Sequence, residues 1–425
     1  MISKQVYDTV LRQFASDRRN PRFLRKPEYK DYPREENSEV LLTSAYYCHH
    51  WAYDKFKDYF EQITQNHKKN YFLVDLPYQL SIKTGLKSEQ QIASQMSENT
   101  FNPLTWDMEM CGKWIGSTEG AYFQFEALEP CRKLTKPFYT KEILEFVNSK
   151  NKKFIDTRKN RELGEIRVLF SDIAIMGGNE NDATIIGLMR LIPQEQKYGD
   201  RVNKYYIREI VYMQSLVGVR TDEQALIIRK LYDEFECDYL VMDGRGGGAS
   251  VFDELSKPLS DPQTGIDYPT PLTSMNYEKF AERCNYPNAK KVVFVVNATS
   301  QLNSEIAMTT QDLITKKRVR FLVSETEAKE TLENIKGYTS FPAEIKGKIM
   351  EQYLQASALI NEMINLKKIE NELGLIKLVE PSRTMRKDRY SALSYALYFS
   401  SILEKELDRG NSYYEDEDDI IYFYN

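Results

Sequence analysis

The sequence of 425 residues predicts an α/β fold, with a mixed β-sheet flanked by helices. Three observations predict it. From residue 166, three strand-like runs follow one another without a helix between them, which is typical of an antiparallel meander. An amphipathic helix and a short apolar strand come next, an order that adds a parallel strand to the sheet. Beyond them, strands and helices continue as far as the C-terminal region.

Residues 1–142 predict a smaller and incomplete α/β segment. Its order is helix, strand, helix and then an irregular stretch rich in tyrosine and tryptophan, and "EVLLTSA" (39–45) is its clearest strand. One strand with two or three helices is too little for a sheet layer of its own. We interpret the polar, lysine-rich residues 143–164 as a linker to the domain that follows.

Residues 165–408 are expected to form the main domain. Strands are expected at 166–175, 183–192 and 204–213. The helix at 221–235 has apolar side chains at helical spacing behind an acidic first turn. The later elements are expected in the order strand 237–243, strand 291–297, helix 304–317, strand 318–323, helix 342–369, strand 374–380 and helix 387–407.

Residues 409–425 form an acidic tail, in which "EDEDD" (415–419) carries five negative charges. The net charge of the chain is -5, so the rest of the sequence is electrically neutral. Basic clusters with interleaved aromatic residues lie at 18–26, 151–161 and 316–321, and such clusters suit a surface that follows a phosphate backbone. For any one of them, a solvated loop is the favoured interpretation.

The composition disfavours several classes of protein. No apolar run approaches the roughly 20 residues of a membrane helix, and the N-terminus lacks the apolar core of a signal peptide, so we expect no membrane association and a cytoplasmic location. Five scattered cysteines without a CxxC pair indicate reduced thiols. Only three histidines are present, and the adjacent His49 and His50 would point apart on a helix or strand, which disfavours a zinc site.

Three aspartates stand at the ends of expected elements. Asp172 lies near the end of the first strand, Asp243 ends the strand after the first helix, and Asp388 opens the last helix. The first and fourth strands of this order are expected side by side, which brings Asp172 and Asp243 together. Clustered carboxylates repel one another unless divalent cations lie between them. The pattern therefore predicts a two-metal phosphodiester site, with Asp182 as a weaker fourth candidate.

Each of these residues also has a purely structural interpretation. Asp388 is a favourable charge at the positive end of a helix, Asp243 is a turn residue before "GRGGG", and Asp182 lies in the good hairpin turn "NEND". Asp172 is the hardest to explain structurally, because aspartate is depleted in strands and costly to bury unpaired.

A nucleotide-binding interpretation finds less support. Gly244, Gly246 and Ala249 fit the dinucleotide pattern G-x-G-x-x-A, but the acidic residue expected about 20 positions later falls in a proline-rich loop. No phosphate-binding loop of the form G-x-x-x-x-G-K-[ST] occurs in the sequence.

The runs "FSDIAIMGGNENDA", "YLVMDGRGGGASVFDEL" and "KDRYSALSYAL", in this order, resemble the nuclease domain of phage terminase large subunits. The resemblance covers about 165–408 and implies an RNase H-like fold. It also implies that Asp172, Asp243 and Asp388 bind two Mg²⁺ or Mn²⁺ ions and cut double-stranded DNA concatemers during genome packaging.

Residues 1–142 are similar to the end of the terminase ATPase domain, a P-loop ATPase-type α/β fold. Thr43 and Ser44 match the coupling motif of that family, a pair of hydroxyls at a strand end that senses nucleotide. The Walker A and Walker B motifs are not present in the sequence. We therefore expect no ATPase activity from this chain alone, and a truncated or split ATPase domain completed by a separate Walker-bearing chain.

The resemblance implies that this viral protein acts in the host cytoplasm, with double-stranded DNA, a portal protein and a small terminase subunit as its partners. Two alternatives remain open. One is another RNase H-like nuclease, of the resolvase or transposase type. The other is a non-catalytic scaffold of the packaging motor.

Overall fold

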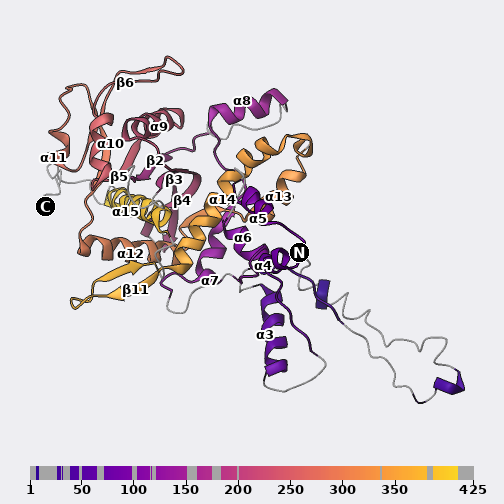
Figure 1. Ribbon diagram of the computed structural model, residues 1–425. Helices are drawn as coiled ribbons and strands as arrows, with labels where there is room; N and C mark the ends of the chain where they lie inside the picture. Colours follow the sequence, from indigo (N-terminus) through magenta and orange to yellow (C-terminus); the bar gives the residue numbers. More distant parts are fainter. Residues whose placement is uncertain are drawn as a thin grey trace. The chain divides into compact units, whose positions relative to one another are not determined.

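A computed structural model describes residues 6–8, 26–29, 31, 39–46, 50–64, 71–97, 103–114, 116, 121–150, 160–174, 183–198, 201–335, 337–380 and 386–409. The chain divides into two compact units, one of residues 1–97 with 103–116 and one of residues 98–102 with 117–425 (Figure 1). Each unit is described by itself below.

The regular elements in the described part of the first unit are helices. Its elements are η3 (Pro27–Tyr29), α3 (Trp51–Thr64), α4 (Tyr78–Lys83), α5 (Glu89–Met96) and α6 (Pro103–Glu109). Helix α5 begins at a reciprocal cap, because the Ser88 hydroxyl accepts from Gln91 N at 3.2 Å and the Gln91 side chain accepts from Ser88 N at 2.9 Å.

The strand expected at 39–45 is wrong, since residues 39–46 have no regular secondary structure. Val40 and Leu42 are 76% and 94% exposed. A β-strand is defined by backbone hydrogen bonds to a neighbour, and the described part of this unit provides none for this segment. The apolar composition of this segment therefore predicted a strand, but no neighbouring strand pairs with it in the described residues.

The second unit is built on an eight-stranded mixed sheet in the order β1-β10-β4-β3-β2-β5-β9-β8. The strands are β1 (Arg132–Leu134), β2 (Ile166–Asp172), β3 (Thr184–Tyr198), β4 (Arg201–Leu216), β5 (Tyr239–Asp243), β8 (Leu272–Ser274), β9 (Lys290–Val296) and β10 (Val319–Leu322). The pairs β2–β3 and β3–β4 are antiparallel, while β5 and β9 add in parallel beyond β2. The expected mixed sheet, meander followed by parallel strands, is confirmed.

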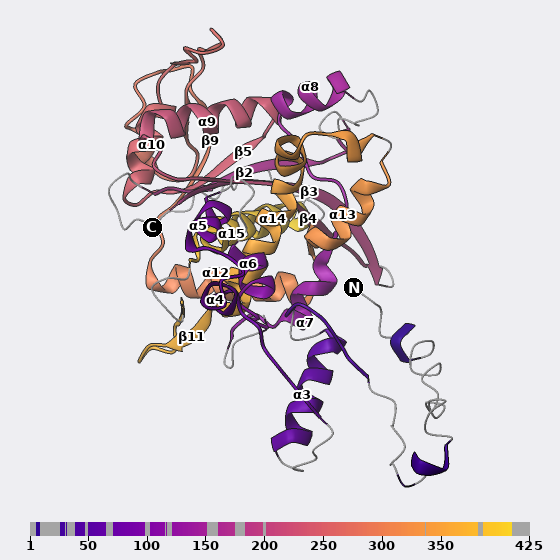
Figure 2. The same cartoon turned by 45° about the vertical axis from the view of Figure 1, so that its right-hand side comes forward.

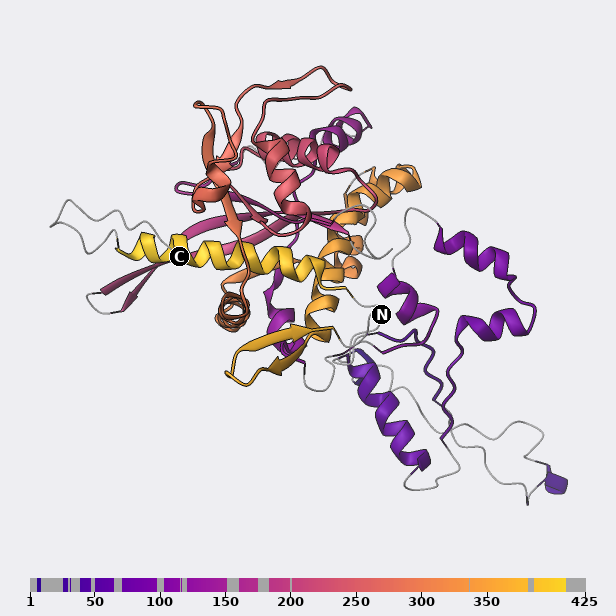
Figure 3. The ribbon, with the colours of Figure 1, turned by 60° about the vertical axis from the view of Figure 1, so that its left-hand side comes forward.

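Helices cover both faces of this sheet (Figures 1 and 2). Helices α9 (Thr221–Glu234) and α10 (Gly247–Leu255) lie on one face, and α12 (Ser300–Thr315), α14 (Ala343–Asn365) and α15 (Asp388–Arg409) lie on the other. Figure 3 shows α15 in yellow along the sheet, where it packs against β2, β3, β4 and β5. The remaining elements are α7 (Phe125–Leu128), η4 (Glu129–Cys131), α8 (Lys141–Lys150), β6 (Leu259–Ser260), β7 (Asp267–Tyr268), α11 (Glu278–Ala281), α13 (Glu325–Glu333), η6 (Tyr338–Ser340), β11 (Lys367–Glu370) and β12 (Ile376–Val379).

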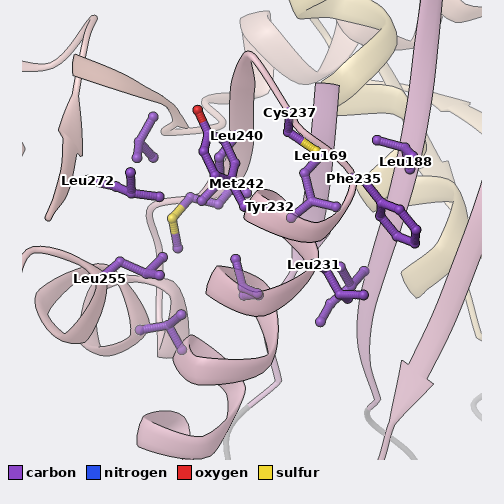
Figure 4. Close-up of a cluster of buried hydrophobic side chains, with 14 of the residues drawn as sticks. Leu169, Leu188, Leu231, Tyr232, Phe235, Cys237, Leu240, Met242, Leu255 and Leu272 are labelled. Carbon is purple, nitrogen blue, oxygen red and sulfur yellow. The ribbon is translucent and has the colours of Figure 1, made fainter. Parts of the chain in front are cut away.

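The apolar core on the α9 side explains why these segments are helices and strands at this place. Leu169 and Leu240 from adjacent strands meet Leu231 and Phe235 from the end of the α9 segment and Leu255 from α10 (Figure 4). All five are buried. Burying a side chain of this size contributes about 1.5–3 kcal/mol, so the core fixes β2 and β5 as neighbours in one rigid layer.

A buried ion network lies at the amino end of β2. Glu165 Oε1 accepts from Arg167 Nε at 2.8 Å, and its Oε2 accepts from Arg190 Nη2 at 2.7 Å. Arg190 continues to Glu209 on β4 at 3.1 Å, and Glu209 continues to Arg320 on β10 at 3.1 Å. The Glu165 and Arg167 side chains are both 0% exposed. These ion pairs connect four adjacent strands of the sheet, β2, β3, β4 and β10.

The unit boundary differs from the one expected at 142. Strand β1 joins the large sheet in parallel with β10, with Arg132 opposite Phe321. Helix α8 replaces much of the expected linker and buries Leu144 and Val147 beside α14. Residues 151–159, the middle of the expected linker, lie outside the description.

Helix α14 is shorter than the expected 342–369. It ends at Asn365, and Leu366 is already extended with φ −71° and ψ 125°. The next four residues form β11, which pairs with β12 from Lys367↔Val379 to Glu370↔Ile376. The pairing with β12 therefore decides the structure of 367–370, against the helical pattern that continues into it.

Candidate metal centre

Asp172 and Asp243 stand at the ends of neighbouring parallel strands. Strands β2 and β5 are in register with Ser171 opposite Met242, and each aspartate is the next residue along its strand. Because the carboxyl ends of parallel strands meet at one edge of a sheet, both side chains belong to the same edge. The expected neighbourhood of the first and fourth strands is confirmed.

Asp388 reaches this edge from the first turn of α15. Its Oδ2 accepts from Ala183 N at 3.4 Å, a long hydrogen bond that mainly marks position. Ala183 directly precedes β3, where Ile185 is paired with Asp172. The structure therefore brings the three sequence-predicted aspartates to one edge of the sheet.

The three carboxylates influence one another electrostatically. Burial, together with the negative charges of Asp243, Asp388 and Glu362, raises the pKa of Asp172 to about 8, while Lys387 opposes the rise. Burial also raises the pKa of Asp243. A group with so much negative charge around it is stabilised by a nearby cation.

The glycines that follow Asp243 have a packing explanation. A Cβ on Gly248 would lie 1.8 Å from the Asp243 carbonyl oxygen, and one on Gly244 would lie 2.5 Å from a Val295 methyl group. Gly246 has φ +53°, a conformation that glycine adopts without strain. The run "GRGGG" thus lets α10 begin directly against the end of β5, and no nucleotide is needed to account for it.

Glu362 is a fourth carboxylate at the site, and sequence reasoning missed it. It lies on α14, is 7% exposed, and its Oε2 accepts from Arg389 N at 2.9 Å and Tyr390 N at 3.1 Å. Its Oε1 accepts from Arg389 Nη1 at 2.7 Å. A glutamate between the buried Leu359, Ile360, Met363 and Ile364 was the available signal.

Tyr395 also faces the acidic edge from α15. Burial raises the pKa of its phenol, and the charges of Asp243 and Asp172 raise it further, while Arg245 lowers it. Tyr395 lies seven residues after Asp388, two helical turns along the same helix face.

Carboxylate oxygens are the ligands that Mg²⁺ and Mn²⁺ prefer, so the donor chemistry of this edge fits such ions. Within the described residues, no three histidine, cysteine, aspartate or glutamate side chains converge closely enough to hold a metal ion. Asp182 lies outside the described residues, as does the acidic run 415–419.

The hydroxyls expected to form a coupling motif are both exposed in the first unit. Thr43 Oγ1 donates to the carbonyl oxygen of Ser44 at 2.9 Å. They belong to segment 39–46, which forms no strand. None of the helices in the described part of the chain is long and apolar enough to cross a membrane.

The sequence matches no protein-family model and no curated protein. The structure is similar to the large terminase nuclease of thermophilic phage G20c, at 11% identity and a TM-score of 0.31, over 56% of this chain and 84% of that chain. The large terminase nuclease domain of Thermus phage P74-26 gives 12% identity and a TM-score of 0.30, over 56% and 81%. The nuclease domain of the large terminase subunit of bacterial virus Sf6 gives 12% identity and a TM-score of 0.28, over 61% and 98%.

The described part of the second unit has a mixed sheet with helices on both of its faces. At TM-scores near 0.3 the likeness carries no argument, and function is inferred below from the residues of this chain.

Proposed function

We propose that this chain is a metal-dependent DNA endonuclease of the viral packaging terminase type. Asp172, Asp243 and Asp388 would bind two Mg²⁺ or Mn²⁺ ions. The observation that carries the proposal is the position of Asp172 and Asp243 at the ends of adjacent parallel strands, with Asp388 brought to the same edge by α15.

When bound, the ions supply an activated water and stabilise the leaving oxygen of the phosphodiester. The residues of this chain provide the geometry. Two aspartates project from strands whose core is fully packed, and the third projects from a helix start held by Glu362. Ligands on rigid elements keep the spacing that in-line attack requires.

The order of the three sequence motifs supports the packaging role. In that role the chain would cut double-stranded DNA concatemers in the host cytoplasm, with a portal protein and a small terminase subunit as partners. The nuclease part would comprise about 165–408 with β1 and α8 added to its sheet and helices. Nuclease domains of this type from phage G20c have been solved with bound magnesium and with bound cobalt.

Plasmid cleavage tests the nuclease proposal. Supercoiled DNA is incubated with the purified chain and Mn²⁺, and Asp172→Asn, Asp243→Asn and Asp388→Asn are each expected to lower the rate on the order of 10³-fold or more, because the ligands act as a unit. Asp312→Asn is the matched control, since Asp312 is an exposed aspartate on α12 paired with Lys316. Full cleavage by Asp243→Asn would end the proposal.

Cleavage of branched and of linear duplexes, measured in the same way, separates the alternatives. A resolvase prefers branched over linear duplexes, whereas a terminase nuclease cuts linear duplexes. A chain that binds DNA but cuts neither substrate with Mn²⁺ would be a non-catalytic packaging-motor scaffold.

For residues 1–142 we propose a partial ATPase-type role. The sequence has no phosphate-binding loop, and nucleotide hydrolysis of this kind needs a glycine-rich loop, a lysine and a Walker B carboxylate. We expect no DNA-stimulated ATP turnover by the purified chain until a separate Walker-bearing chain is added. ATP turnover by the chain alone that is lost on Thr43→Ala would contradict this.

A further inference from the structure

Arg245 is held beside the acidic edge by the turn that follows β5. Gly244 N donates to Val296 O at 2.8 Å, which extends the pairing with β9. Arg245 N donates to Asp243 Oδ1 at 3.0 Å, and Gly248 N donates to Arg245 O at 3.0 Å. The backbone of Arg245 is thus fixed on both sides.

The Arg245 side chain extends toward the end of β9. Its Nε donates to Asn297 Oδ1 at 2.9 Å, and Asn297 directly follows β9. Both residues are exposed. In the part of the chain that the structure describes, the two terminal guanidinium nitrogens of Arg245 make no hydrogen bond or ion pair.

Other exposed arginines of this unit are paired with carboxylates. Arg220 contacts Asp222 at 2.9 Å, and Arg161 contacts Asp238 at 2.8 Å. Arg245 lies close enough to Asp243 and Tyr395 to influence their ionisation, yet it forms no such pair with the described carboxylates. Its charge is oriented by a neutral amide and remains available to an anion.

The chemistry of the guanidinium identifies that anion. With Nε engaged by Asn297, Nη1 and Nη2 still present a planar pair of donors, which matches two oxygens of a phosphate. DNA that enters a two-metal site carries its phosphates along the carboxyl edge of the sheet. The end of β9 lies beside the end of β5 on that edge, with Asp243 opposite Val296.

We propose that Arg245 binds a backbone phosphate of the DNA on the β9 side of the acidic edge, and that Asn297 positions its guanidinium. The inference rests on the proposed nuclease function. In this proposal Arg245 contacts the DNA substrate and has no part in binding the metal ions.

The test compares four variants of the full chain, Arg245→Gln, Arg245→Lys, Asn297→Ala and Lys291→Gln. Lys291 is the matched control, because it is an exposed cation on β9 about 20 Å of strand away from Asn297. Binding to a linear duplex is measured in EDTA at several salt concentrations, KM and kcat are measured with Mn²⁺, and Mn²⁺ binding is measured by electron paramagnetic resonance.

Arg245→Gln is expected to raise the Kd for DNA and the KM about ten- to a hundredfold and to lower the salt slope of binding by about one. Its Mn²⁺ affinity should stay at the wild-type value. Arg245→Lys should recover part of the loss, Asn297→Ala should lose less than Arg245→Gln, and Lys291→Gln should match the wild type.

Two results would overturn the inference. One is an Arg245→Gln protein with the DNA affinity and KM of the wild type, which together with an inactive Asp243→Asn would leave the nuclease function standing. The other is a loss of Mn²⁺ affinity as large as the loss of DNA affinity. A chain that cuts no DNA but binds it through Arg245 would overturn the nuclease function and support the phosphate contact.

Discussion

The two ends of strand β2 carry carboxylates in opposite electrostatic states. At the amino end, burial alone would raise the pKa of Glu165, but hydrogen bonds from Arg190 and Arg167 lower it to about 2. At the carboxyl end, burial and three neighbouring carboxylates raise the pKa of Asp172 to about 8. The two groups are separated by about 23 Å of the same strand.

The difference lies in the partners and not in the strand. Glu165 accepts hydrogen bonds from two arginines and from Glu162 N, whereas Asp172 accepts none from the described residues. A buried carboxylate with cationic partners stabilises the fold, and one surrounded by carboxylates costs stability. The excess negative charge at the carboxyl end of β2 is therefore typical of a cation-binding site, whereas the paired charges at the amino end are typical of a structural contact.

The largest expected effect is on the free energy of unfolding when the carboxylate at either end of β2 is replaced by an amide. Glu165→Gln should lower the free energy of unfolding by about 3–5 kcal/mol, because Arg167 is left buried without its carboxylate. Asp172→Asn should not lower it, because an amide avoids the cost of placing an ionisable carboxyl among other carboxylates. Urea unfolding of both variants without metal measures this. A loss on Asp172→Asn as large as that on Glu165→Gln would remove the distinction between the two ends.

On acidification Asp172, with a pKa of about 8, takes up a proton long before Glu165, with a pKa of about 2, so the loss of stability at low pH is expected from the amino end. The pKa of Glu165 is lowered from 4.5 to about 2 by folding, so its stabilisation is present above about pH 4.5 and is lost as the pH falls toward 2. The lowering corresponds to about 3 kcal/mol. Unfolding free energies measured between pH 5 and pH 2.5 should fall less steeply in Glu165→Gln than in the wild type. Equal slopes would show that the network does not depend on this ionisation.

Glu362 tests how the carboxyl end is positioned. Both of its oxygens accept from N–H donors of the first turn of α15, so we expect it to hold Asp388 in place. Glu362→Ala should weaken Mn²⁺ binding about 10- to 100-fold, the usual range for groups that orient metal ligands. The measurement is a Mn²⁺ titration by electron paramagnetic resonance.

Glu362→Gln should recover part of this loss, because an amide oxygen still accepts from the backbone although it is a poor metal ligand. Gln355→Ala is the matched control, since it removes only the 2.8 Å contact to Arg389 Nε. Failure of Glu362→Gln to bind Mn²⁺ better than Glu362→Ala would mean that Glu362 acts as a ligand.

The smallest effect is expected where a pair is exposed. Asp312 and Lys316 form a 2.7 Å ion pair one turn apart on α12, with both side chains about half exposed. Asp312→Ala should change the unfolding free energy by no more than about 0.5 kcal/mol. A change of the size expected for Glu165 would show that pairing, and not burial, sets the energy of these networks.

Sequence periodicity located the central strands and helices well, because their apolar patterns are long and the core they bury is large. It failed where the outcome depends on distant partners. Strand β1 has only three residues and exists because β10 pairs with it. The apolar segment 39–45 has the composition of a strand and lacks such a partner in the described residues.

The same limit applies to the candidate site. Asp172 and Asp243 were visible in the sequence because each breaks an apolar run at its end. Glu362 and Arg245 were not, since a glutamate within a helix and an arginine in a turn are ordinary residues until their neighbours are known. Their roles follow from Arg389, Tyr390 and Asn297, which come from other parts of the chain.

The pairing of β1 with β10 also limits how early the sheet can be completed while the chain is synthesised. Arg132 is paired with Phe321, so the ribosome must add nearly two hundred residues before the partner of the first strand exists. At about 5–20 residues per second this takes about 10–40 seconds. Meanwhile the meander β2–β3–β4, whose strands are close together along the chain, can already pair. The first strand of this sheet to be synthesised therefore waits longest for its neighbour.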